Sequence, residues 1–427
     1  MKSTIHLLSI LFLFSFWACK NDATQNANST TASSELSAEG LVGTLQKKLI
    51  EAQDGDVILL PAGQFEFQRP LSFNDVPNVT IKGQGKDKTI LSFKGQIEGA
   101  EGLIVKSAKN ITLEGFCVQD TKGDAIKVQD CEDVVLRDLK VTWTGGAKAT
   151  NGAYGLYPVT CKNVLMENCE ASYAMDAGIY VGQTTNFVVR GNWAHHNVAG
   201  IEIENSINGE VYDNRATENT GGLLIFDMPD LPQANGSDVK IYQNVMELNN
   251  HPNFSAEGIT VNILPPGTGM LLMAHRNLEV FENEVRGHNT LGLGILSWLF
   301  TQRPFKSEEY DPYCSNVNVY KNIFADNNGE ADQSTDLGKL LASLFKGKGN
   351  DIVIDGIFNP KHLDDKGQFL ADKKICIREN GEVSFANLNA GKGAKPEEMA
   401  KNMDTKAELF DCELASLELK GLEALKK

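Results

Sequence analysis

The sequence lacks an excess of basic residues, and it lacks long apolar runs beyond its first twenty positions. Lysine and arginine number 40 against 56 aspartates and glutamates, so the net charge is −16 at pH 7. This charge argues against a nucleic-acid partner, because contacts to phosphates need a basic surface. An acidic polymer would need a local basic patch or a bridging cation.

Cysteines are few and are not grouped. The eight cysteines include no Cys-x-x-Cys pair and no haem signature. We therefore expect no cofactor held by cysteine, although a Ca²⁺ ion bound by oxygen ligands remains an alternative. Cys131 and Cys161 hold matching places in the sequence, either as a disulfide or as two buried thiols. Cys376 and Cys412 are candidates to link the C-terminal region, and with Cys19 set aside the cysteine count is odd.

The only long apolar run lies at the N-terminus, over residues 7–17. It is too short for a transmembrane helix, which needs ~20 apolar residues, but it suits a secretory signal. The cysteine that follows resembles a bacterial lipoprotein processing site. We predict a signal peptide over residues 1–18, a lipid anchor at Cys19 and a flexible tether over residues 19–40. The expected location is the cell envelope of a Gram-negative bacterium, at the outer membrane or facing the periplasm.

Two short phrases alternate along the chain and predict its fold. The first, polar–aliphatic–x–aliphatic–x–small, recurs at 78–83, 110–115, 133–138, 163–168 and 186–191, and more loosely at 238–243, 277–282 and 316–321. The second, small–aliphatic–x–aliphatic, recurs at 125–128, 178–181, 200–203, 222–225 and 258–261. Successive first phrases are separated by steps as short as 23 residues, with no helix between strands. This pattern predicts an all-β solenoid, a right-handed parallel β-helix.

Several further features fit this fold. Four asparagines are placed for a stacked amide ladder: Asn168, Asn192, Asn214 and Asn244. Leucines at helical spacing over residues 41–49 predict a helix that caps the first coil. We predict the β-helix over residues 41–328 and a capping or accessory region over residues 329–427. This last region should contain a helix near 337–345 and a strand at 351–355, and we expect the protein to be monomeric.

The chain resembles the secreted, pectate-lyase-like parallel β-helix repeat proteins of bacteria. The resemblance rests on residues 54–63, 120–127, 151–158, 176–182 and 198–205, and covers about 41–328. It is nearest to a subgroup of exported or lipoprotein members that are often encoded beside a c-type cytochrome-like protein. The resemblance implies the fold and no single activity, since the superfamily includes lyases, epimerases, hydrolases and adhesins. The Asp-Pro-His-Asp motif of mannuronan epimerases is absent.

Aligning the second phrase predicts one outward column of side chains. It reads Lys127, Tyr157, Tyr180, Glu202, Leu224 and Thr260. The turns beside it add Asp124, Tyr154, Asp176, His195 and His196. Neighbouring coils stack at about 4.8 Å, so this face would span a few sugar units.

The candidate catalytic residues are Lys127, Tyr157, Tyr180, Glu202, His195 and Asp176. For β-elimination on a uronate, Lys127 or His195 would neutralise the carboxylate or act as base, and a tyrosine would protonate the leaving oxygen. Glu202 paired with Asp176 would instead suit hydrolysis or hold Ca²⁺. The simpler readings are stacked tyrosines, a solvated lysine and a polar His-His turn whose two side chains point opposite ways. Glu204 reads as a carboxylate at the edge of a turn.

Asp124, Tyr154 and Trp298 are the candidate substrate-binding residues. Asp124 and Tyr154 belong to the turns beside the column, and Trp298 belongs to one of the long loops, such as 226–236 and 298–305, that interrupt the later coils. The aromatic residues of these loops would stack on sugar rings, or the loops would instead cover the core or dock a partner protein. The predicted function is binding, and cleavage or epimerisation, of an acidic polysaccharide. The alternative is a non-catalytic scaffold that docks an envelope redox protein of the cytochrome type. A lipid at Cys19 would attach either protein to the membrane.

Overall fold

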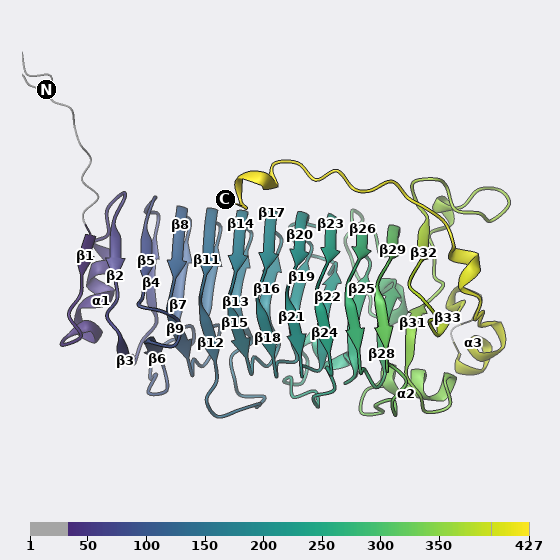
Figure 1. Ribbon diagram of the computed structural model, residues 1–427, viewed down its shortest axis with the longest axis horizontal. Coiled ribbons are helices and arrows are strands. Elements are labelled where there is room, and N and C mark those ends of the chain that lie inside the picture. Colours follow the sequence, from purple (N-terminus) through teal and green to yellow (C-terminus); the bar gives the residue numbers. More distant parts are fainter. Residues whose placement is uncertain (1–32, 394, 427) are drawn as a thin grey trace, which may run out of the picture. The chain divides into compact units, whose positions relative to one another are not determined.

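Three parallel sheets wind around one elongated core (Figure 1). The computed structural model describes residues 33–393 and 395–426. The predicted signal peptide, Cys19 and most of the predicted tether lie outside this range, but residues 33–35 form a strand. Among the described residues, no helix has the length and apolar character needed to cross a bilayer.

The sheets are named A, B and C. Sheet A has 12 strands in the order β1 (Ser33–Glu35), β2 (Val57–Leu59), β5 (Thr80–Lys82), β8 (Lys109–Glu114), β11 (Glu132–Arg137), β14 (Lys162–Glu167), β17 (Thr185–Arg190), β20 (Ile207–Tyr212), β23 (Ser237–Tyr242), β26 (Arg276–Phe281), β29 (Ser315–Tyr320) and β32 (Ile375–Arg378). Sheet B has ten: β3 (Gly63–Glu66), β6 (Thr89–Ser92), β9 (Cys117–Gln119), β12 (Lys140–Thr142), β15 (Glu170–Ser172), β18 (Trp193–His195), β21 (Arg215–Thr217), β24 (Val245–Glu247), β27 (Glu284–Arg286) and β30 (Ile323–Ala325).

Sheet C has 11 strands: β4 (Leu71–Asn74), β7 (Leu103–Lys106), β10 (Ile126–Gln129), β13 (Tyr154–Val159), β16 (Ala177–Gly182), β19 (Ala199–Glu204), β22 (Gly221–Phe226), β25 (Thr268–Met273), β28 (Leu291–Leu296), β31 (Asn350–Ile354) and β33 (Phe385–Asn387). Each coil adds one strand to a sheet, and every neighbouring pair is parallel, as in β16 with β19. The parallel β-helix predicted from the repeat is therefore confirmed. The coils continue beyond residue 328, because β31, β32 and β33 extend sheets A and C.

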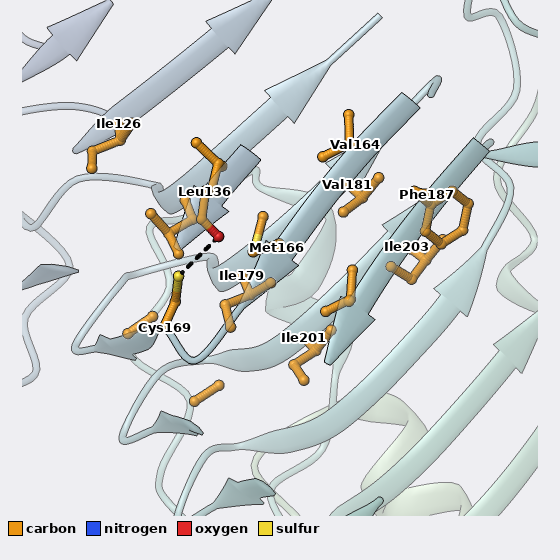
Figure 2. Close-up of a cluster of buried hydrophobic side chains, with 14 of the residues drawn as sticks. Ile126, Leu136, Val164, Met166, Cys169, Ile179, Val181, Phe187, Ile201 and Ile203 are labelled. Atoms are coloured by element: carbon orange, nitrogen blue, oxygen red, sulfur yellow. Dashed lines mark hydrogen bonds between the residues drawn. The ribbon is translucent and has the colours of Figure 1, made fainter. Parts of the chain in front are cut away.

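Alternate side chains of each strand fill the core. Ile201 and Ile203 from β19 point inward beside Ile179 and Val181 from β16, and they meet side chains of sheet A such as Phe187 (Figure 2). Each of these side chains is fully buried. Burial of one such side chain contributes roughly 1.5–3 kcal/mol, so the stacked rows supply most of the driving force for folding.

Two rows of asparagine side chains hold the turns between sheets. One runs through Asn192, Asn214, Asn244, Asn283, Asn322 and Asn380, each Nδ2 donating to the next Oδ1 at 2.9–3.0 Å. The prediction was wrong for Asn168, which lies one residue before the ladder position of its coil and has a φ of 57°. The ladder place on that coil belongs to Cys169, whose backbone N–H donates to Asn192 Oδ1 at 2.9 Å.

The second ladder lies between sheets B and C and contains a histidine. It runs through Asn197, Asn219, Asn249, His288 and Asn327. Burial lowers the pKa of His288 to about 4, so its ring is neutral at pH 7. A neutral ring has one donor and one acceptor nitrogen, which is what an amide ladder requires.

The two ends of the coil stack are covered. Helix α1 (Leu41–Ile50) buries Leu41, Leu45 and Leu49 at the first coils, as predicted. Near the other end lie α2 (Asp336–Leu344), which matches the predicted helix, and α3 (Pro396–Asn402). Short 3₁₀ helices are η1 (Thr260–Ile263), η2 (Trp298–Thr301), η3 (Pro360–His362), η4 (Ala390–Lys392), η5 (Ala407–Phe410) and η6 (Leu422–Ala424).

The C-terminal strap, residues 413–426, runs back across the outer face of sheet A (Figure 1, yellow). Leu422 is buried against β14 and β17, and Lys426 Nζ lies 2.7 Å from a Glu210 carboxylate oxygen. A disulfide between Cys376 and Cys412, the two candidates for such a link, joins the residue before the strap to β32. Cys131 and Cys161, in contrast, are buried free thiols, the second of the two alternatives.

Candidate functional site

The predicted outward column forms on sheet C. Lys127 pairs in register with Tyr157, and Tyr180 with Glu202, on consecutive coils. Glu202 is followed by Leu224 and then by Leu271, so the prediction of Thr260 was wrong. Residues 258–261 also fit the strand phrase, but residues 268–273 extend the sheet and residues 260–263 form η1 in the preceding loop.

Three tyrosines pack together on this face and are called the tyrosine platform: Tyr154, Tyr157 and Tyr180. Their ring centroids are separated by 4.4–4.9 Å. Tyr154 and Tyr157 are half-buried, whereas Tyr180 is only 3% exposed. A sugar ring could therefore reach the platform at the Tyr154–Tyr157 side and not at Tyr180.

The one lysine of the column lies against this accessible side. Lys127 Nζ is 4.9 Å from the centroid of the Tyr157 ring, within the range of a cation–π interaction. The same Nζ is 3.7 Å from a carboxylate oxygen of Asp124. Burial raises the pKa of Asp124, although the charge of Lys127 opposes this shift. Asp124, Lys127, Tyr154 and Tyr157 together are called the open end.

A group of three carboxyls lies beside the tyrosines and is called the acid cluster: Asp176, Glu202 and Glu204. Asp176 and Glu202 are 5% and 1% exposed, and each has one buried oxygen without a hydrogen-bond partner among the described residues. Burial raises the pKa of Asp176 to about 7 and the pKa of Glu202 well above its usual value. Neighbouring carboxylates add to both shifts, so protons are held in this cluster near neutral pH.

Glu204 belongs to this cluster and is not the edge residue expected from the sequence. Tyr180 Oη donates a hydrogen bond to Glu204 Oε1 at 2.9 Å. Burial raises the pKa of Glu204 to about 7, against the opposing effect of that hydrogen bond. The sequence held a signal for this placement, because Glu204 is two residues after Glu202 and therefore points to the same face.

The bond between Tyr180 and Glu204 depends on Gly182. A Cβ at Gly182 would overlap the Tyr180 ring, which lies directly over this position. Gly182 pairs in register with Glu204 on the next coil, so the ring leads the hydroxyl toward that carboxyl.

His195 lies apart from the column, on β18 of sheet B. Its ring stacks on Trp193 with centroids 4.1 Å apart, and its Nδ1 is 2.9 Å from His196 Nδ1. The expectation that the two histidines point apart was wrong, because His196 follows the strand with φ 58° and turns back. The two histidines therefore form a separate polar pair on sheet B, away from the tyrosine platform on β13 and β16 of sheet C.

Trp298 is also placed differently from the prediction. It is 3% exposed, and its indole N–H donates to the carbonyl of Arg303 at 3.1 Å. Trp298 packs edge-on to Tyr310 within an apolar cluster, so it holds a loop in place and offers no face to a sugar.

The outer face of sheet C becomes apolar beyond the acid cluster. A cavity of about 580 Å³ lies over β22 and β25, with Leu224, Phe226, Leu271 and Met273 in its lining. Leu224 pairs in register with Glu202, and Phe226 with Glu204. Acid cluster and cavity are thus neighbours on one face.

Two further observations complete the site. Among the described residues, no group of three or more His, Cys, Asp or Glu side chains is arranged to hold a metal ion.

A fully buried pair that the sequence did not indicate lies nearby, with His275 Nδ1 2.7 Å from Asp227 Oδ1. Tyr310 Oη donates to the Asp227 carbonyl at 2.7 Å, so this pair anchors the same loop as Trp298.

Comparison with known proteins identifies the class. The family model for the right-handed β-helix region matches residues 101–225 and, overlapping them, 144–303. With the three parallel sheets, this match makes the chain a right-handed parallel β-helix protein. No curated protein sequence matches the chain.

Several solved structures are distantly similar to the chain. The A-module of a mannuronan C-5 epimerase from Azotobacter vinelandii is 13% identical with a TM-score of 0.44, over 74% of this chain and 87% of that one. A polygalacturonase from Erwinia carotovora is 12% identical with a TM-score of 0.45, over 78% and 93%. An alginate lyase from Paenibacillus is 14% identical with a TM-score of 0.41, over 59% and 88%. Since these likenesses are low, no activity is carried over from them.

Proposed function

We propose that this β-helix protein binds an acidic, uronate-containing polysaccharide at the open end and removes the proton next to the sugar carboxylate. Loss of this proton starts both β-elimination and epimerisation, so the same residues suit either reaction. The observation that carries the proposal is Lys127, held over the ring of Tyr157 beside a second half-buried tyrosine.

The open end offers what a uronate needs. The cation of Lys127 would neutralise the sugar carboxylate, which makes the neighbouring C5 proton more acidic. The faces of Tyr154 and Tyr157 offer apolar area on which a sugar ring can stack. Lys127 is the one cation of the Lys127–Leu271 column, so it is the group of this column that can meet a sugar carboxylate.

Two groups are available for the proton transfers. The carboxylate of Asp124 would take the C5 proton, and its raised pKa makes it a stronger base. The electron pair then forms the C4–C5 double bond as the C4–O4 bond breaks, and Tyr157 O–H donates its proton to O4. Burial raises the pKa of Tyr157 to about 12, which keeps this proton in place at pH 7. In epimerisation, the O–H proton is delivered to C5 from the opposite side.

The hydrolytic use of Glu202 with Asp176 is less well supported. Both carboxyls are at least nine-tenths buried, so neither is within reach of a polymer. Tyr180 is likewise unsuited to protonate a substrate, because its hydroxyl already donates its proton in a hydrogen bond to Glu204. The acid cluster would position Tyr154 and Tyr180 beneath the substrate and hold protons without contacting it.

The test is incubation of the purified protein with polymannuronate, polyguluronate and polygalacturonate in D₂O. Far-ultraviolet absorbance detects the unsaturated product of elimination, and NMR detects deuterium at C5. We expect one of these signals from the wild type and its loss in Lys127→Gln and Tyr157→Phe. A matched control is Arg215→Gln, which changes a cation on sheet B. Neither signal with any polymer would overturn the chemistry, and absence of binding would overturn the proposal as a whole.

The second candidate is a non-catalytic scaffold that docks an envelope redox protein. One observation favours it: Trp298 and Glu202, which were expected to meet a substrate, are only 3% and 1% exposed. Binding of a polyuronate without either signal would leave a glycan-binding module, whereas absence of binding to every polyuronate would favour this scaffold. A lipid anchor at Cys19, a location in the cell envelope, a monomeric state and a bound Ca²⁺ ion remain predictions from the sequence.

A further inference from the structure

The cavity over β22 and β25 has a lining unlike a glycan site. Its floor consists of Leu224, Phe226, Leu271 and Met273, and Leu264 and Leu337 are among its walls. The surfaces that bind sugars need hydrogen-bonding groups, because each sugar hydroxyl that leaves water must find a partner. This lining provides few, so the cavity suits a hydrocarbon group.

The size and openness of the cavity fit a small ligand. Its volume of about 580 Å³ lies in the range of small-molecule sites, roughly 300–1,000 Å³. Gln302, Asp336 and Pro396 line the cavity and are exposed, so it opens to solvent at its rim. When a hydrocarbon group displaces water from an apolar hollow, the free energy of the system falls, and this favours binding.

One lining charge is unpaired. Arg303 makes no side-chain hydrogen bond and no ion pair with any residue that the structure describes. Its position is nevertheless fixed, since its carbonyl accepts from the Trp298 indole and its N–H donates to Thr301 Oγ1 at 3.2 Å. The other lining charge, Asp336, lies 2.9 Å from Lys339 Nζ and is already compensated.

We propose that this cavity binds a single-chain anionic amphiphile, with the hydrocarbon chain over Leu224 and Leu271 and the anionic head on Arg303. A half-buried guanidinium without an ion-pair partner among the described residues, on a backbone fixed beside an apolar hollow, recognises a carboxylate or a phosphate ester. The site is separate from the open end, so it adds a second ligand to the polysaccharide proposed above. Either activity can exist without the other.

The experiment uses cis-parinaric acid, a fatty acid that fluoresces when its chain enters an apolar site, and its uncharged methyl ester. We expect saturable binding of the acid, about tenfold tighter than binding of the ester. Arg303→Gln should remove this preference and leave the ester unaffected. Leu271→Trp should fill the cavity and abolish binding of both probes. Displacement by hexadecanoate or by hexadecyl phosphate identifies the preferred head group.

Controls separate loss of the site from loss of the fold. Arg215→Gln should bind both probes as the wild type does, and circular dichroism should show the β-helix in each variant. If Leu271→Trp does not fold, Met273→Trp fills the same floor and should give the same loss. Unchanged binding in a folded cavity-filling variant would overturn the site. Equal affinity of the wild type for acid and ester would overturn the role of Arg303.

Discussion

Replacement of Glu204 by glutamine tests the acid cluster directly. The amide oxygen of glutamine can still accept the hydrogen bond from Tyr180, so the variant removes the titrating proton and leaves the contact in place. Because the pKa of Glu204 is raised from 4.5 to about 7 in the folded protein, the folded state keeps a proton that the unfolded state has lost. The free energy of unfolding therefore falls as pH rises from about 4.5 to about 7.

The size of this effect follows from the shift. One pKa unit corresponds to about 1.4 kcal/mol, so a shift of about 2.5 units corresponds to about 3 kcal/mol. The wild type should lose this amount between pH 4.5 and 7.5, on top of changes from other groups, and Glu204→Gln should not. Above pH 7.5 the difference between the two proteins should stay constant. The contribution of His288, whose pKa is lowered to about 4, is the same in both and cancels.

The assay is urea unfolding of both proteins at pH 5 and at pH 8, followed by circular dichroism. Glu204→Gln should lie within about 1 kcal/mol of the wild type at pH 5 and exceed it by about 3 kcal/mol at pH 8. A glutamine at the exposed Glu257 is the matched control and should follow the wild type at both values. Equal pH dependence of wild type and Glu204→Gln would refute the burial of a protonated carboxyl at this position.

Three further variants test the fold around the site. Asn214→Ala removes a ladder amide that makes four buried hydrogen bonds and should cost about 3–5 kcal/mol in urea unfolding. Asn208→Ala removes two hydrogen bonds at a half-buried position and should cost less. Gly182→Ala should displace the Tyr180 ring, seen as a changed near-ultraviolet tyrosine signal, and cost about 1–3 kcal/mol. Cys412→Ser should leave the β-helix folded and make the strap the first site of limited proteolysis; a strap that stays resistant would contradict its anchoring by the disulfide.

The repeat in the sequence predicted the coils well because both have the same physical cause. An aliphatic side chain at every second position is what a strand facing a core requires, and stacking of equal coils fixes the register. The column from Lys127 to Glu202 follows from that register alone. So does the position of Glu204: periodicity places it on the outer face, although its place at the end of a strand predicts a carboxylate at the edge of a turn.

The remaining features depend on contacts between distant segments. The place of Thr260 could not be predicted, because residues 258–261 and 268–273 both fit the strand phrase and only one can extend sheet C. His196 turns back on a positive φ, which the pattern of strand residues does not encode. Trp298 is buried because its loop packs against Tyr310 and the apolar cluster around it, and loop paths are set by packing rather than by periodicity.

The central claim is that a polyuronate binds at the open end of sheet C. Amide hydrogen exchange with and without an oligouronate, resolved to peptides, measures this directly. We expect slower exchange in peptides that contain Asp124 to Gln129 and Tyr154 to Val159, and no change around Trp193 and His195 on sheet B. Protection confined to sheet B, or no protection at a saturating concentration of every oligouronate, would contradict it.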